Sequence, residues 1–277
     1  MSRIVAATVL CGLVVAATAC GERSEPTGAS ANAYPVTVTG ADGTTTRVES
    51  RPRRILAVGS EMLATLQALG VRAQVLQDSA ALPSRRFDLT LTWASSEDGD
   101  AFLRRRPRGE VYVAPDRSLE DVQRSLGRIG LLVGKPLPGR RLGDRIGRQR
   151  RLVASRLAGA PAASVFLDTG FFHTVSSRSL AGDIIREAGG TNVAGATPEP
   201  GPFDLEVLEA RDPRFYVATS ESGTTLPGLR RNDQTRALTA VKRGRFGVIA
   251  TSLLDPGPNV GLAVAALARV LHPDAFR

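Results

Sequence analysis

The spacing of apolar and polar residues in the first half of the chain alternates between the period of a strand and that of a helix. Alternating positions on both sides of Asp42-Gly43 predict a β-hairpin, because this pair of residues suits the tight turn between two strands. The elements predicted after it are a strand at 55–58, a helix at 60–69, strands at 88–93 and 110–114, and a helix at 119–132. Strands and helices that alternate in this way are typical of a parallel α/β sheet.

The pattern changes in the middle of the chain. Residues 138–158 carry no strand signal and predict one long helix, and about 21 residues at a rise of 1.5 Å span about 30 Å, enough to cross a lobe. The alternation restarts with a strand at 164–168, an extended segment at 172–176, helices at 180–188 and 205–210, strands at 215–219 and 246–250, and a helix at 261–271. We expect an α/β fold of two lobes with parallel-rich sheets, 35–137 and 161–277, joined by a single long backbone helix at 138–160.

The first twenty residues predict an export signal. Arg3 is followed by an apolar stretch at 4–17, which is too short to span a bilayer but suits the core of a signal sequence. Small residues lead into Cys20, an arrangement that resembles a bacterial lipobox, in which cleavage precedes the cysteine and its thiol is lipidated. We expect a lipoprotein signal peptide at 1–19 and a flexible, lipid-anchored tether at 20–34, which place the protein outside the cytoplasm on the outer face of the bacterial cell membrane. An ordinary signal peptide is the alternative.

Composition and charge narrow the function classes. Apolar residues make up 42% of the chain and charged residues 23%, which is the composition of a globular protein. The formal net charge is +9, and 34 of the 36 basic residues are arginine. No basic surface with interleaved aromatic residues accompanies this charge, so we expect no nucleic-acid partner.

Reactive side chains are scarce in the expected mature chain. Cys20 is its one cysteine, which excludes an internal disulfide. The two histidines, His173 and His272, are far apart in the sequence, so we expect no bare metal site and no cofactor. The chain has no Gly-x-Ser-x-Gly or His-Glu-x-x-His motif, and Gly134-Lys135 is followed by proline in place of the Ser or Thr of a phosphate loop. We therefore expect a binding protein and not an enzyme.

Several short motifs follow one another along almost the whole expected mature chain. They are Tyr34-Pro35-Val36-Thr37-Val38 with Pro52-Arg53-Arg54-Ile55-Leu56, Leu66-Gln67-Ala68-Leu69-Gly70, Ser179-Leu180-Ala181-Gly182-Asp183, Ala188-Gly189-Gly190-Thr191-Asn192, Leu205-Glu206-Val207-Leu208 and Leu271-His272-Pro273. In this order they resemble the ABC-transporter solute-binding proteins that deliver iron–siderophore chelates, haem or cobalamin. The order of the series carries the resemblance, because no single motif is specific.

The resemblance implies a monomer with two lobes on a helical backbone and a ligand cleft between them. It also implies a lipid-anchored component of an ABC importer, which captures a ferric siderophore, haem or cobalamin and delivers it to the permease. Proteins of this family present one carboxylate from each lobe to arginines of the permease. Glu206 matches the second-lobe position, whereas the first-lobe position falls on Ala64; Glu61, on the same helical face, is the candidate substitute.

Two departures from the family leave a second function open. Ala64 lacks the docking carboxylate, and 17 residues separate Gly70 from Asp88, where the family usually has a fuller block of strand, loop and helix. A first lobe trimmed in this way would have a more open cleft wall. The alternative is a degenerate binding-protein fold that acts as a non-transport envelope interaction or sensor lipoprotein.

Residues just after strand ends are the candidates for the ligand cleft, because α/β sheets bind ligands at the carboxyl ends of their strands. They are Ser60, Trp93, Ser95, Phe171, Phe172, His173, Ser220 and Asp255. Trp93 would either stack on a macrocycle or plug the core, and the two phenylalanines would line the cleft or pack between elements. His173 would be an axial haem ligand or an ordinary polar partner. These residues are compatible with all three ligand classes.

Overall fold

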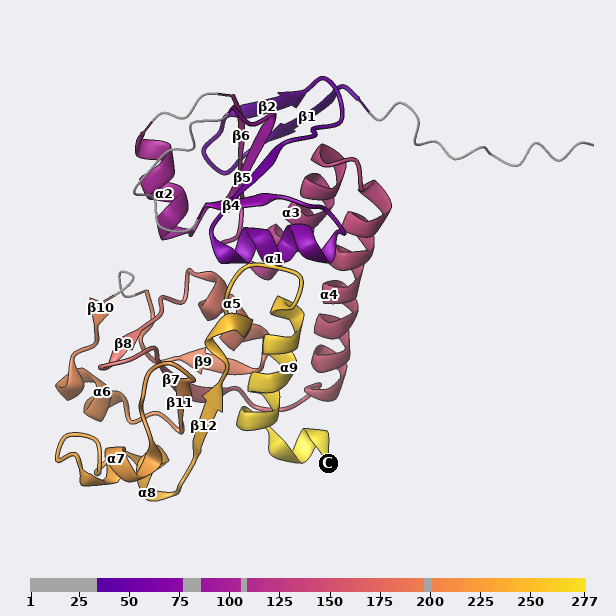
Figure 1. Ribbon diagram of the computed structural model, residues 1–277. Helices are drawn as coiled ribbons and strands as arrows, with labels where there is room; N and C mark the ends of the chain where they lie inside the picture. The colour runs from indigo at the N-terminus through magenta and orange to yellow at the C-terminus, as the bar shows by residue number, and fades with distance from the viewer. Residues whose placement is uncertain (1–33, 77–85, 106–108, 197–200) are drawn as a thin grey trace, which may run out of the picture. The chain divides into compact units, whose positions relative to one another are not determined.

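The computed structural model describes residues 34–76, 86–105, 109–196 and 201–277 (Figure 1). The predicted signal peptide, Cys20 and nearly all of the predicted tether lie outside the described residues. Two four-stranded parallel sheets organise the described part, one before helix α4 (Pro136–Arg156) and one after it. We call the described residues before α4 the first lobe and those after it the second lobe. No helix in these ranges is long and apolar enough to cross a membrane.

The sheet of the first lobe has the strand order β4-β3-β5-β6, and all its neighbouring strands are parallel. Its strands are β3 (Ile55–Val58), β4 (Gln74–Leu76), β5 (Leu89–Trp93) and β6 (Glu110–Ala114). Its helices are α1 (Ser60–Ala68), α2 (Glu97–Arg104) and α3 (Leu119–Leu132). The predicted hairpin is confirmed as an antiparallel pair, β1 (Val36–Thr39) and β2 (Thr45–Val48).

Both faces of this first sheet are covered, as expected for a parallel sheet. Strand β3 is buried along its length, and alternate residues belong to two different apolar clusters. Ile55 and Ala57 belong to the main cluster, which also contains apolar residues of α1 and α3. Leu56 and Val58 pack in a smaller cluster with Phe102 of α2. The period-two alternation of side chains thus places one layer of helix on each face.

The sheet of the second lobe has the order β12-β11-β7-β9 and is also parallel throughout. Its strands are β7 (Ala163–Asp168), β9 (Gly190–Asn192), β11 (Phe215–Thr219) and β12 (Phe246–Ile249). Its helices are α5 (Leu180–Glu187), α6 (Leu205–Arg211), α7 (Leu226–Arg231), α8 (Thr239–Lys242) and α9 (Val260–Leu271), with 3-10 turns η1 (Thr251–Leu253) and η2 (Pro273–Phe276). An aromatic cluster of Phe166, Phe203 and Tyr216 fills one face of this sheet.

The predicted extended segment at 172–176 is wrong at its first residue, Phe172, and is confirmed as a strand at 173–174. Regular strand structure there is confined to β8 (His173–Thr174), which pairs antiparallel with β10 (Gly201–Pro202). Phe172 has a φ of 61° and Phe171 a φ of 50°, so both lie in the left-handed region. The backbone N–H of His173 donates to the carbonyl of Gly170, at 2.8 Å, and closes a tight turn that includes Phe172.

Helices α3 and α4 pack backbone against backbone. A Cβ atom on Gly130 would lie 2.8 Å from the Cα atom of Gly139, and a Cβ atom on Gly139 would lie 2.6 Å from the carbonyl oxygen of Leu126. Side chains larger than hydrogen are therefore excluded at this contact, which we call the glycine seam (Gly130 and Gly139). On another side α4 packs against the end of the chain, where Arg145 donates to the carbonyl of Pro258, at 3.2 Å, just before α9.

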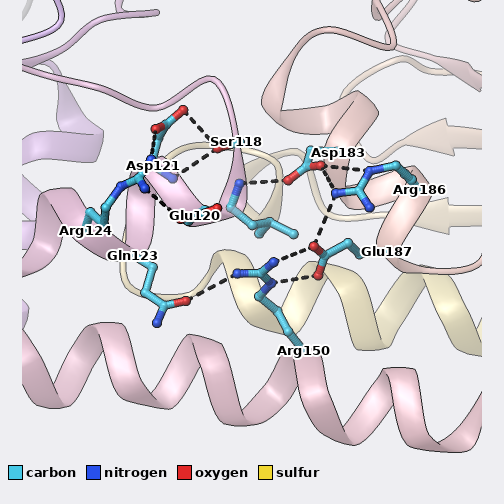
Figure 2. Close-up of polar contacts among 10 residues, drawn as sticks. Ser118, Glu120, Asp121, Gln123, Arg124, Arg150, Asp183, Arg186 and Glu187 are labelled. Carbon is cyan, nitrogen blue, oxygen red and sulfur yellow. Dashed lines mark hydrogen bonds and ion pairs between the residues drawn. The ribbon is translucent and has the colours of Figure 1, made fainter.

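A polar network beside α4 joins helices of both lobes (Figure 2). At the start of α3, the backbone N–H of Leu119 donates to Oδ2 of Asp183 on α5, at 2.9 Å. The guanidinium of Arg150 on α4 binds both carboxylate oxygens of Glu187 on α5, with an Nε–Oε2 distance of 2.7 Å. The same guanidinium donates to Gln123 on α3, at 3.3 Å. We call these five residues the inter-lobe clasp.

The clasp has few degrees of freedom. The side chains of Arg150 and Glu187 are only 24% and 15% exposed, and their bidentate geometry fixes the orientation of both groups. Asp183 places a negative charge at the N-terminus of α3, where the helix dipole favours it. A connection of this kind permits small rotations of the lobes and opposes large ones.

Candidate functional site

The carboxyl ends of the parallel strands lead into loops that line a pocket with a volume of about 310 Å³. Both lobes contribute to its lining, with Trp93 at the end of β5 in the first lobe and Asp255 beyond β12 in the second. The described residues that line it are Glu61, Trp93, Ser95, Ser96, Glu97, Asp98, Asp255 and Pro256. Four of the predicted site residues, Glu61, Trp93, Ser95 and Asp255, are therefore brought together by the fold.

Trp93 forms a buried wall of the pocket. It is 1% exposed and belongs to the main apolar cluster, as expected for a side chain that plugs the core, and stacking on a ligand stays a prediction. Its indole Nε1 is buried and has no hydrogen-bond partner among the described residues. Buried polar groups nearly always have a partner, so this N–H is an exception among the described residues that line the pocket.

The pocket carries negative charge from both lobes. Glu61, in the first turn of α1, accepts a hydrogen bond from Ser60 Oγ at 3.1 Å, and Glu97 and Asp98 lie in the first turn of α2. Burial, together with the negative charges of Glu61 and Glu221, raises the pKa of Asp255 to about 6. None of the four lining carboxylates forms an ion pair with a described residue, and the described lining contains no arginine or lysine.

Asp116 positions the first-lobe side of the pocket. Its side chain is 1% exposed, and its Oδ2 accepts hydrogen bonds from the backbone N–H of Ser95 at 2.9 Å and from Ser95 Oγ at 2.7 Å. Burial raises the pKa of Asp116. Beside it, Ser96 Oγ accepts from the backbone N–H of Gly99 and caps α2.

Helix α2 was not predicted from the sequence, and neither were Glu97 and Asp98 in its first turn. Its N-terminal signal is nevertheless present in the sequence, because Ser96 is followed at once by two acidic residues. The glycine at 99 and the short length of the helix weaken the apolar period that would have identified it.

Asp168, which was not among the predicted site residues, organises the corresponding loops of the second lobe. Its side chain, 1% exposed, accepts hydrogen bonds from the Tyr216 hydroxyl at 2.8 Å, from Thr224 Oγ1 at 2.7 Å and from the backbone N–H of Gly170 at 2.8 Å. Burial and the Asp168 carboxylate raise the pKa of Tyr216. This carboxylate holds the tight turn that carries Phe171.

The other predicted residues of the second lobe lie elsewhere than in the lining of this pocket. Phe171 is 90% exposed, Phe172 packs against the aromatic cluster of the second sheet, and His173 is half-buried in β8. Ser220 is exposed, and its Oγ lies 3.2 Å from Oγ1 of Thr251. A side chain that follows a strand end can thus face solvent or the core as readily as the cleft.

The two predicted docking carboxylates occupy different settings. Glu206 is exposed in the first turn of α6, and Glu61 lines the pocket. Ser60 and Ala64, on the same helix as Glu61, are exposed.

Within the described residues no group of three or more histidine, cysteine, aspartate or glutamate side chains is arranged to hold a metal ion.

No protein-family model matches the chain, and no curated protein matches it in sequence. Solved structures do match. A nickel–histidine complex of Helicobacter pylori CeuE has a TM-score of 0.70 at 14% identity over 87% of this chain and 89% of that one. A Saccharomonospora viridis protein of an ABC-type Fe³⁺-hydroxamate transport system has a TM-score of 0.66 at 19% identity over 86% and 99%. The periplasmic vitamin B12-binding protein BtuF of Vibrio cholerae has a TM-score of 0.66 at 14% identity over 82% and 98%.

These similarities confirm the predicted fold class, an α/β protein of two lobes with parallel sheets. The structural neighbours are ABC-transporter periplasmic binding proteins, as the sequence motifs suggested. At identities of 14–19% the likeness establishes the fold and leaves the function to be argued from the site.

Proposed function

We propose that this protein is the solute-binding component of an ABC importer and that it captures a metal chelate in the pocket between Trp93 and Asp255. One observation supports this function above all: loops at the carboxyl ends of two parallel sheets converge on one pocket, in a fold shared with proteins that bind chelated metals. The protein binds its ligand without transforming it, and affinity and docking constitute its mechanism. Cys20, which lies outside the described residues, anchors it to the outer face of the cell membrane.

Each part of the structure has a role in this function. The two lobes supply opposite walls of the pocket, and the inter-lobe clasp and α4 limit the closure that follows ligand entry. Glu206, exposed on α6, is the second-lobe contact for arginines of the permease. Glu61 lies in the pocket, so we assign it to the ligand in place of the docking role.

The test is calorimetric unfolding of the mature chain, with Cys20→Ser to prevent lipid attachment. Unfolding of the protein is measured without ligand and then with a ferric hydroxamate, a ferric catecholate, haemin or cobalamin. A ligand at a thousand times its Kd stabilises the folded state by about 4 kcal/mol, which raises Tm by about 10 °C for a chain of this size. Each metal-free chelator serves as the control for its complex.

A shift with one complex and none with its metal-free chelator supports the importer function and identifies the ligand class. If no ligand shifts Tm, the importer function fails. The degenerate binding fold then remains, and the exposed Ala64 at the first docking position already agrees with that alternative.

A further inference from the structure

We propose that the pocket selects a ligand with a net positive charge, an organic cation or a chelate that carries a free cationic group. This inference rests on the proposed function and specifies its ligand class. It is carried by the charges of the lining residues and by the unsatisfied donor in the pocket wall.

The lining charges have one sign. Glu61, Glu97 and Asp98 enter from the first lobe and Asp255 from the second, and Glu221 lies close enough to Asp255 to affect its titration. No described arginine or lysine lines the pocket to neutralise them. An anionic chelate would meet like charge from both walls, whereas a cation would replace the missing counter-charge.

This negative pocket stands out from the rest of the chain. The formal net charge is +9, so a ligand attracted by the average field of the protein would be an anion. The four carboxylates around one cavity of about 310 Å³, which have no ion-pair partner among the described residues, instead favour a cation there. Because charge repulsion among them is relieved when a cation enters, the ligand-free pocket is prepared for positive charge.

Trp93 supplies an independent indication of a ligand. The residue is 1% exposed and is among those that line the pocket, and its indole N–H is unsatisfied within the described residues. An N–H donor requires an acceptor atom, and no described residue provides one. A ligand that carries both a cationic group and an acceptor oxygen satisfies the carboxylates and the indole together.

The geometry favours a molecular cation over a bare metal ion. Within the described residues the carboxylates do not converge into a group of three that could coordinate one metal. They are distributed over α1, α2 and the loop after η1, which suits a ligand of several atoms whose charge is spread or remote from its metal.

The titration of Asp255 makes selection dependent on pH. Its raised pKa of about 6 means that it is ionised at pH 7.5 and largely protonated at pH 5. The charged groups that face it are Glu61 on α1 and Glu221 after β11, and Glu97 and Asp98 on α2 line the same pocket. All are acidic, so protonation of Asp255 as pH falls removes one negative charge from the pocket and weakens the binding of a cation.

The probes are a linear ferric tris-hydroxamate that carries one free ammonium group, its N-acetylated neutral form, and an anionic ferric tris-catecholate. Binding to the mature chain with Cys20→Ser is followed by quenching of Trp93, the single tryptophan. At pH 7.5 we expect the ammonium form to bind about tenfold more tightly than the acetylated form, and the catecholate to bind most weakly.

Two isosteric variants and one control test whether the preference for the ammonium form comes from the carboxylates of the pocket. Glu61→Gln and Asp255→Asn should each reduce the preference for the ammonium form severalfold, and Asp255→Asn should also abolish the change in preference between pH 7.5 and pH 5. Asp144→Asn, an exposed carboxylate on α4 away from the pocket lining, should leave the preference unchanged.

The outcomes separate this inference from the proposed function. If the acetylated form or the catecholate binds as tightly as the ammonium form, or if the two variants keep the full preference, the charge inference is overturned and the importer function stands. If none of the three complexes binds, and haemin and cobalamin also fail in the calorimetric test, the importer function falls and the charge inference falls with it.

Discussion

The carboxyl group of Asp255 lies half-buried within reach of two other acidic side chains. Its pKa is about 6 in the folded protein and about 3.9 in an unfolded chain, so between these values the unfolded chain binds fewer protons. The free energy of unfolding therefore decreases as pH rises from about 4 to about 6 and stays reduced above that range. A site that binds a cation in this way costs stability while it is empty.

Asp255→Asn removes this cost. We expect the variant to be more stable than the unmodified protein by about 1–2 kcal/mol at pH 7.5, after allowance for solvent screening, and to show no gain at pH 4. The measurement is Tm in the absence of ligand at the two pH values. An equal gain at both pH values would show that the titration of Asp255 is not the cause. A more stable variant with weaker cation binding would identify a residue kept for function.

Asp168 has the opposite effect on stability, because its buried carboxylate accepts three hydrogen bonds. Asp168→Ala leaves the hydroxyl of Tyr216 buried without its acceptor, and we expect a loss of about 3 kcal/mol in the free energy of unfolding. Urea unfolding measures this loss. Asp144→Ala, at an exposed site, should change stability by less than about 0.5 kcal/mol. A comparably small effect at Asp168 would contradict a structural role.

Among the elements, α3 and α4 show how closely sequence can define a helix. The predicted bounds of α3, 119–132, agree with the structure, in which Ser118 Oγ caps the helix by accepting from the N–H of Asp121 at 3.1 Å. The start of α4 lies at Pro136, two residues before the prediction, since proline is tolerated in the first turn of a helix.

The glycine seam provides a test within one helix. Gly130→Ala would place a methyl group against backbone atoms of α4, which cannot move aside. We therefore expect the free energy of unfolding to fall by about 1–3 kcal/mol. Gly127→Ala is the matched control on the same helix, because its Cβ would meet nothing within 4 Å, and higher helix propensity should stabilise it by up to about 1 kcal/mol. Chemical denaturation of both variants decides the matter. The close packing at the glycine seam is refuted if the two substitutions change the free energy of unfolding in the same direction.

The contact between Asp183 and the first turn of α3, which is part of the inter-lobe clasp, can be tested by hydrogen exchange. In Asp183→Ala the amide of Leu119 loses its acceptor, so its hydrogen exchange should accelerate at least tenfold, while amides in the middle of α3 change less. Asp274→Ala, which removes an exposed ion pair with Arg277, should leave exchange at Leu119 unchanged. If Leu119 keeps its protection in Asp183→Ala, the clasp does not restrain the first turn of α3.

At the scale of the whole molecule, the alternation of strands and helices was sufficient to predict two parallel sheets. The short elements β4, β9, α2, α7 and α8 were missed, because three to eight residues contain too few apolar repeats to define a period. The pocket was predicted only in part. The rule that cleft residues follow strand ends found Trp93 and Asp255, but side-chain direction depends on packing between segments more than 150 residues apart in the chain, which the sequence does not display.

Packing of α4 against both α3 and α9 has a consequence for how the chain is synthesised. Helix α3 has already been made when α4 emerges from the ribosome, so the two can pack at once. Helix α9 follows about a hundred residues later. Until then the face of α4 around Ile146, which lies next to Gly261 of α9 in the structure, is exposed to solvent. A fragment that ends at residue 160 should therefore expose apolar surface, bind a hydrophobic dye and aggregate, whereas the full chain does not. The strands and helices that are made first therefore end in a helix, α4, whose second apolar side is covered only when α9 has been made.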